Sequence, residues 1–192
     1  MKKSRMCLLL ILIALFTMGI SNAHAITKME QRFLDSFPSS ISDWERQSSY
    51  NYEKEAPGGG VSISYGLNDA VATLYIYNMN LKTIPSGISS KVIKGEFSES
   101  KAAIITAKLQ GYYQDVVKKN EGKAKFGLDK KMSFLFANYY ITQNDIDLDS
   151  YLYITAIKNH YFKIRVTSTK GTLTEENLKP FLDSATDLVF LL

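Results

Sequence analysis

The sequence predicts an α+β domain over residues 26–192, in which a mostly antiparallel sheet is packed by helices as an α/β/α sandwich. Three observations predict this class. The chain has 192 residues, 45% hydrophobic and 22% charged, a composition typical of one globular domain. Its strand-like runs follow one another through connections that are too short for crossovers, which favours antiparallel neighbours. Segments with helical spacing of apolar residues lie near the start, in the middle and at the end of the chain.

Residues 1–25 are typical of a secretory signal peptide. Lys2, Lys3 and Arg5 form a basic start, an apolar run follows, and Ala23-His24-Ala25 ends the segment with small residues at alternate positions. The alternative is an uncleaved anchor helix, but a spanning helix needs about 20 apolar residues and this run weakens after Met18. We therefore expect cleavage after Ala25, export to the periplasm or the extracellular space, and no stable membrane span after cleavage.

Removal of this segment changes the charge and the reactive groups of the chain. The full sequence has 23 Lys+Arg and 19 Asp+Glu, and three of the cations but none of the anions lie in residues 1–25, which leaves a formal charge of +1. So small a charge gives no reason to expect a nucleic-acid partner. The same segment holds the only cysteine and one of the two histidines. The mature chain is therefore expected to have no disulfide, thiol nucleophile or cysteine-based zinc site.

The first predicted element is a short amphipathic helix over 26–37. Its apolar residues recur at intervals of three and four, and Pro38 ends it. Trp44 follows in a polar stretch and is interpreted as a ring that plugs one edge of the core. Residues 56–60, which contain Gly58-Gly59-Gly60, are interpreted as a flexible turn.

A strand pair and a long helix come next. Apolar and polar residues alternate over 61–67, and Asn68-Asp69 leads into a second strand over 71–77, so these two strands are expected to pair. The middle of the chain predicts a helix over 98–120, with Ser98 as N-cap and Gly122 as its end. Its expected buried face consists of Ala102, Ile105, Leu109, Tyr112 and Val116.

The C-terminal part predicts three strands and a helix. Strands are expected over 134–142, 151–157 and 161–167, and the last two must form a hairpin because only 158–160 separates them. An apolar stripe from Leu178 to Leu192 predicts the terminal helix, with Asn177 or Thr174 as cap. Pro180 favours Asn177, because proline is best tolerated in the first helical turn.

The order of elements resembles the PsbP-like family, the extrinsic photosystem proteins and their bacterial periplasmic relatives. Three stretches carry the resemblance: Phe37-Pro38 with Asp43-Trp44, the 71–77 strand before the long helix, and the 151–167 hairpin before the last helix. The resemblance implies an antiparallel sheet flanked by helices, in a small non-enzymatic accessory or binding protein. It implies no particular functional residue.

The motifs for common chemistries are incomplete. Asp145, Asp147 and Asp149 match the first ligands of a calcium loop, but Ser150 and Ala156 stand where its glycine and its bidentate glutamate should be. The Ser98-x-x-Lys101 pattern of penicillin-recognising enzymes lacks its partner motifs, and no Gly-x-Ser-x-Gly elbow accompanies His160, which is interpreted as an exposed hairpin tip. The triple glycine lacks the Gly-Lys-Ser/Thr of a phosphate loop. We therefore expect no catalytic residue, metal or cofactor.

One feature favours binding, and it comes from the alternation of side chains across a sheet. One expected face is apolar and consists of Leu74, Ile76, Ala137, Ile141, Leu152, Ile154, Phe162, Ile164 and Val166. The opposite face would carry Thr73, Asn138 and Thr167 together with the candidate site residues Tyr75, Tyr77, Tyr140, Tyr151, Tyr153, Lys163 and Arg165. Tyrosine suits surfaces that meet a ligand or a partner. The alternative is that a helix covers this face.

The leading hypothesis is therefore an exported accessory or binding protein without catalytic activity, which binds an envelope protein or a small ligand through the tyrosine-rich face. An alternative is a carrier that holds an apolar molecule or lipid in a pocket between the sheet and the helix over 98–120. The least favoured hypothesis is an envelope hydrolase based on carboxylates, because no acidic pair stands out in the sequence.

Overall fold

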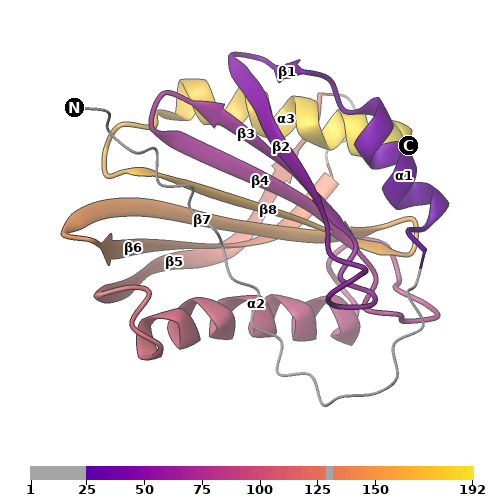
Figure 1. Cartoon of the computed structure of the whole chain (residues 1–192), viewed down its shortest axis with the longest axis horizontal. Helices are drawn as coiled ribbons and strands as arrows, with labels where there is room; N and C mark the ends of the chain where they lie inside the picture. The colour runs from indigo at the N-terminus through magenta and orange to yellow at the C-terminus, as the bar shows by residue number, and fades with distance from the viewer. Residues whose placement is uncertain (1–24, 129–131) are drawn as a thin grey trace.

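The computed structural model describes residues 25–128 and 132–192, and its eight strands form one antiparallel sheet in the order β1-β2-β3-β4-β8-β7-β6-β5 (Figure 1). The strands are β1 (Ser40–Ile41), β2 (Trp44–Asn51), β3 (Val61–Leu67), β4 (Ala70–Tyr77), β5 (Asp115–Phe126), β6 (Met132–Gln143), β7 (Ile146–Ile157) and β8 (His160–Thr169). The helices are α1 (Lys28–Ser36), α2 (Lys91–Leu109) and α3 (Glu175–Leu191). The predicted α+β class is confirmed.

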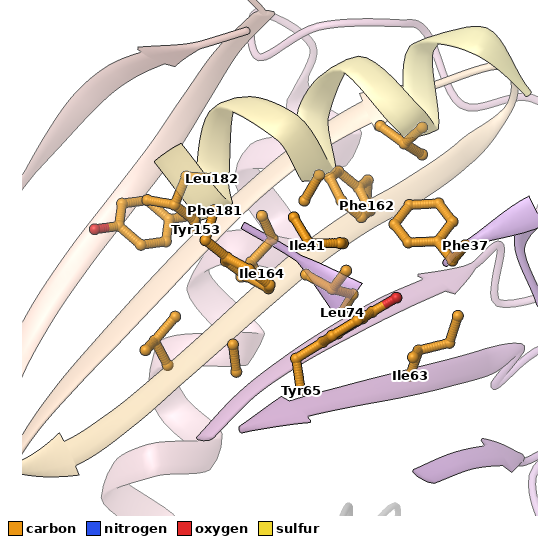
Figure 2. Close-up of a cluster of buried hydrophobic side chains, with 14 of the residues drawn as sticks. Phe37, Ile41, Ile63, Tyr65, Leu74, Tyr153, Phe162, Ile164, Phe181 and Leu182 are labelled. Atoms are coloured by element: carbon orange, nitrogen blue, oxygen red, sulfur yellow. The ribbon is translucent and has the colours of Figure 1, made fainter. Parts of the chain in front are cut away.

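The helices cover both faces of the sheet. In Figure 1, α1 and α3 lie on one face and α2 lies on the other. The α1/α3 face holds the larger core, in which Phe162 and Ile164 of β8 pack with Leu74 of β4 beneath Phe181 of α3 (Figure 2). Trp44 is fully buried in this core, as the sequence predicts: its ring lies 4.7 Å from that of Phe181, and its Nε1 donates to the Asn177 carbonyl oxygen at 3.2 Å.

The α2 face holds a second core. Ile93, Phe97 and Ile104 of α2 pack with side chains of β4, β6, β7 and β8. Among the described residues, no helix is long and apolar enough to cross a membrane. The signal-peptide prediction for residues 1–25 lies, apart from its last residue, outside the described residues.

The long helix starts and ends earlier than the sequence predicts. Ser90, not Ser98, is the N-cap, and its hydroxyl accepts from the Ile93 N–H at 3.3 Å. The helix ends at Leu109, two residues before Gly111 adopts a φ of 81°. Gly122 does not stop a helix but lies inside β5, which the sequence did not predict. The β-branched pair Val116-Val117 explains this strand, since both residues pair with β6.

The predicted buried face of this helix is also wrong. Ala102, Ile105, Leu109 and Tyr112 are exposed, and Leu109 is 81% accessible. The residues that do face the sheet include Ile93, Phe97, Ser100 and Ile104, which also recur at intervals of three and four but lie on a different side of the helix. The stripe that the sequence offers as a core face is therefore the outer surface of α2.

The other elements are closer to prediction. The hairpin between β7 and β8 and the pairing of β3 with β4 are confirmed, whereas β2 was not predicted. At the start of α3, Thr174 is the cap: its hydroxyl accepts from the Asn177 N–H at 3.3 Å, so the preference for Asn177 was wrong. Pro180 lies inside the helix and removes one backbone donor there.

Candidate functional site

The strand register divides the predicted tyrosine face between the two sides of the sheet. Residues directly opposite each other on neighbouring strands share a face. Lys163 lies opposite Tyr75, whereas Tyr153 lies opposite Ile164 in the apolar core. Tyr75, Tyr77, Lys163 and Arg165 are therefore on the α2 face, while Tyr140, Tyr151 and Tyr153 are on the α1/α3 face. The prediction of a single tyrosine face was wrong.

The cause is the turn between β7 and β8. Lys158 and Asn159 have φ values of 47° and 65°, which makes this a two-residue turn that pairs Ile157 with His160. An odd-numbered residue of β7 then lies opposite an even-numbered residue of β8. The same reversal occurs between β6 and β7, where Gln143 pairs with Ile146. The predicted apolar face is divided in the same way, because Ala137, Ile141, Leu152 and Ile154 lie on the α2 face.

The tyrosines on the α1/α3 face have three different surroundings. Tyr153 is buried below α3 (Figure 2), and its ring lies 5.3 Å from that of Phe126. Tyr151 is half-buried and packs against the same core. Tyr140 is half-buried between two ammonium groups, with Lys119 Nζ at 4.0 Å and Lys170 Nζ at 4.7 Å from its ring centroid. For Tyr153, the alternative of a face covered by a helix is the correct one.

The α2 face does hold a cavity, which we call the Lys163 pocket. It has a volume of about 40 Å³ and lies between α2, strands β4 and β8, and the loop from β2 to β3. Met79 is the one lining residue of this cavity that is exposed, at 47%, and we take it as the mouth. Its lining residues are Tyr52, Gly59, Tyr75, Tyr77, Met79, Glu96 and Lys163.

Lys163 is a buried cation with aromatic neighbours, and no carboxylate of the described residues lies within ion-pair distance of its ammonium group. The residue is only 7% exposed, and its Nζ lies 4.9 Å from the ring centroids of both Tyr75 and Tyr77. Within residues 25–128 and 132–192, no hydrogen bond or ion pair engages its ammonium group. Burial lowers the pKa of Lys163 to about 8; the Glu96 carboxylate opposes this shift, and the Arg165 charge adds to it.

Glu96 connects α2 to the pocket floor. Its Oε1 accepts a hydrogen bond from the Tyr77 hydroxyl at 2.7 Å and another from the Ser100 hydroxyl at 3.3 Å. Burial, together with the adjacent Glu96 carboxylate, raises the pKa of Tyr77 well above its ordinary value. Tyr77 therefore stays a neutral donor that orients the carboxylate.

Arg165 is a second buried cation on the same face, although it does not line the pocket. Its Nη2 donates to Ser150 Oγ at 2.8 Å, and its Nε has no hydrogen-bond partner among the described residues. It pairs across the strands with Thr73 and Leu152, neither of which carries charge. Buried charges are usually paired, so these two cations make the α2 face unusual.

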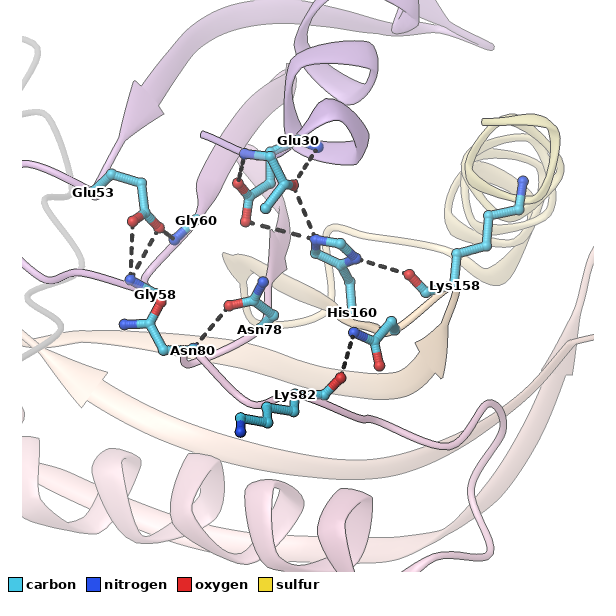
Figure 3. A network of polar contacts seen from close by, with 11 residues as sticks. Glu30, Glu53, Gly58, Gly60, Asn78, Asn80, Lys82, Lys158 and His160 are labelled. Carbon is cyan, nitrogen blue, oxygen red and sulfur yellow. Dashed lines mark hydrogen bonds and ion pairs between the residues drawn. The ribbon is translucent and has the colours of Figure 1, made fainter. Parts of the chain in front are cut away.

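The glycine loop at 58–60 forms a fixed wall of the pocket. Buried Glu53 accepts from the Gly58 N–H at 3.0 Å and from the Gly60 N–H at 2.7 Å (Figure 3). The Met79 N–H donates to the Gly58 carbonyl oxygen at 2.8 Å. A Cβ atom on Gly60 would lie 2.0 Å from the Ile76 carbonyl oxygen, and the φ of Gly60 is 67°. The interpretation of this loop as a flexible turn was wrong, because its backbone is held on both sides.

His160 is buried and not the exposed hairpin tip that the sequence suggests. Its Nδ1 donates to the Lys158 carbonyl oxygen at 2.9 Å, and its Nε2 lies 3.1 Å from Thr27 Oγ1 and 3.8 Å from Glu30 Oε1 (Figure 3). These contacts tie the start of α1 to the β7–β8 turn. Within the described part of the chain, no three His, Cys, Asp or Glu side chains are grouped so that they could hold a metal ion.

Sequence reasoning found three of the pocket residues, Tyr75, Tyr77 and Lys163, and missed the others. Tyr52, Met79 and Glu96 come from a loop, a strand end and a helix that meet only in the folded chain. The Gly58-Gly59-Gly60 run was the one sequence signal for the loop between β2 and β3 that borders the pocket. No model of a known protein family matches the chain, and a search of curated proteins finds no similar sequence.

Proposed function

We propose that the protein is an exported binding protein without catalytic activity, and that the Lys163 pocket binds the carboxylate group of its ligand. The observation that carries this proposal is the buried Lys163 ammonium, which lines a cavity and, in the part of the chain that the structure describes, has no anionic partner within ion-pair distance. A desolvated charge is costly unless it is paired. A bound carboxylate would supply the missing partner.

The size of the pocket defines which part of the ligand enters. A water molecule needs about 10–15 Å³ measured in this way, so a cavity of about 40 Å³ admits a group of a few atoms. A carboxylate fits, and the rest of the ligand would lie outward against Tyr52 and Met79. Two sources offer this chemistry: a small organic acid, or an Asp or Glu side chain of an envelope protein.

The same size counts against the lipid-carrier alternative, because an acyl chain needs several times this volume. The hydrolase alternative needs two carboxyl groups facing one substrate, and Glu96 is the one carboxylate among the pocket-lining residues. The accessory role that the PsbP-like resemblance implies agrees with a binding protein.

The proposal is tested by titrating the ¹⁵N-labelled protein with acetate and phenylacetate at pH 6.5 and following amide shifts by NMR. We expect saturable shifts in β4, β8 and the start of α2. The Lys163→Met variant should bind at least about tenfold more weakly, since a charge-assisted hydrogen bond contributes roughly 1.5–3 kcal/mol. Acetamide, which has the same shape without the charge, should not bind.

The matched control is Lys125→Met, which removes an exposed lysine of β5. This variant should bind the acids as the wild type does. Equal affinity of the wild type and Lys163→Met would contradict the proposal, as would shifts that fall outside the pocket. Lys163→Arg keeps the charge and should retain part of the affinity, which distinguishes loss of charge from loss of structure.

A further inference from the structure

The Lys163 amine has the surroundings of a nucleophile. Its Nζ is held between two tyrosine rings, it makes no ion pair among the described residues, and it borders a cavity that opens at Met79. The exposed lysines of β5, such as Lys125, are in water, where the ammonium form is well solvated. An amine that water does not solvate loses its proton more readily and attacks electrophiles as the free base.

We propose that Lys163 is a covalent attachment site for aldehydes, which condense with its Nζ inside the Lys163 pocket to form an imine. This inference rests on the same pocket as the proposed function but does not need carboxylate recognition. It adds a chemical class of ligand: small aldehydes, or the aldehyde end of a larger molecule whose remainder lies toward Tyr52 and Met79.

The condensation is balanced without any oxidant or reductant. The Nζ lone pair forms a bond to the carbonyl carbon, the π electrons of the C=O bond move to oxygen, and one of the two N–H protons passes from nitrogen to that oxygen. The resulting carbinolamine loses its hydroxyl group and the remaining N–H proton as one water molecule, which leaves a C=N bond. Glu96 and the Tyr77 hydroxyl bonded to it are pocket groups that can exchange protons during these steps.

The protonation equilibrium supports this chemistry. With a pKa of about 8, roughly a quarter of Lys163 is the free amine at pH 7.5, whereas about one part in a thousand of an ordinary lysine is unprotonated. A less basic amine is also a weaker nucleophile, which removes part of this advantage. The net expectation is that Lys163 reacts about tenfold faster than an exposed lysine.

The experiment uses limiting ¹³C-formaldehyde with cyanoborohydride at pH 7.5, which traps each imine as a methylated amine. Peptide mapping by mass spectrometry then gives the rate at each lysine. We expect Lys163 to be labelled at least about tenfold faster than Lys125 in the folded protein, and at the same rate as Lys125 in urea. Lys163→Arg, which keeps the positive charge, should remove this label and leave the others unchanged.

Equal or slower labelling of Lys163 in the folded protein would overturn the inference. Formaldehyde carries no carboxylate, so this result is independent of the acetate titration. Fast labelling without acetate binding would support the imine site and reject the proposed function. Acetate binding without fast labelling would support the proposed function and reject the imine site. Acetate that slows the labelling would support both the proposed function and the imine site.

Discussion

At the scale of single residues, the burial of the Lys163 charge lowers the stability of the folded chain. The ammonium group loses contact with water and lies against two aromatic rings, and no carboxylate among residues 25–128 and 132–192 is within ion-pair distance. The sequence marks Lys163 as a candidate through strand alternation alone. That no ion pair forms with Glu96 could not be predicted, because it depends on how the Glu96 carboxylate of α2 is engaged by Tyr77 of β4 and by Ser100 of its own helix.

This residue should make stability depend on pH in a defined direction. The pKa of Lys163 falls from 10.5 in the unfolded chain to about 8 in the folded one, so between these values the unfolded chain binds more protons. The free energy of unfolding therefore rises with pH across this window, by up to about 3 kcal/mol, and the full penalty is present below pH 8. We expect Lys163→Met to be more stable than the wild type at pH 7.

Urea denaturation of both proteins at pH 7, 8 and 9 measures this effect. The stability difference between Lys163→Met and the wild type should shrink as the pH rises, while the difference for Lys125→Met should stay flat. Comparison at or below pH 9 avoids the tyrosines, whose raised pKa values act in the opposite direction at higher pH. A constant difference across the series would show that the Lys163 charge is not desolvated.

At the scale of elements, the sequence predicted which helices and strands exist better than it predicted which face of each one is buried. The strands 61–67 and 71–77 and the β7–β8 hairpin were found from alternation, since their apolar residues leave little choice. Which residues of two neighbouring strands share a face of the sheet depends on the length of the turn between them. One residue more or less in the turn at Lys158-Asn159 would bring the other set of β8 side chains to a given face of β7. For α2, two sets of residues recur at intervals of three and four, and periodicity alone does not decide which of them is buried.

The side of α2 is tested by two neighbouring isoleucines. Ile104 is 2% exposed and Ile105 is 44% exposed, so the same substitution has different consequences at the two positions. Ile104→Ala should lower the free energy of unfolding by about 2–4 kcal/mol through lost burial and a cavity. Ile105→Ala should change it by less than about 0.5 kcal/mol. Urea denaturation measures both, and the reverse order would mean that α2 packs through the predicted stripe.

At the scale of the whole molecule, the sheet separates two cores and exposes one long edge. Among the described strands, β5 (Asp115–Phe126) pairs with β6 alone, so its other side has no strand neighbour. Open edges invite pairing with other chains, and lysines are a common defence. This edge carries Lys118, Lys119, Lys123 and Lys125.

Removal of that charge should promote self-association. The double variant Lys123→Thr with Lys125→Thr has a higher strand propensity and fewer charges on the open edge, so we expect its apparent mass in light scattering to rise with concentration by about twofold or more, relative to the wild type. Lys123→Arg with Lys125→Arg keeps the charge and should behave as the wild type does. Association of both double variants alike would exclude charge as the protective factor.

The backbone wall at Gly58–Gly60 restricts how ligand selectivity could be altered in this scaffold. Peptide atoms, not a replaceable side chain, shape that side of the opening, and Glu53 fixes them from behind. Redesign of the pocket for a longer or bulkier acid would therefore have to proceed from the α2 side, at Glu96, where a substitution alters the contour without displacing the main chain.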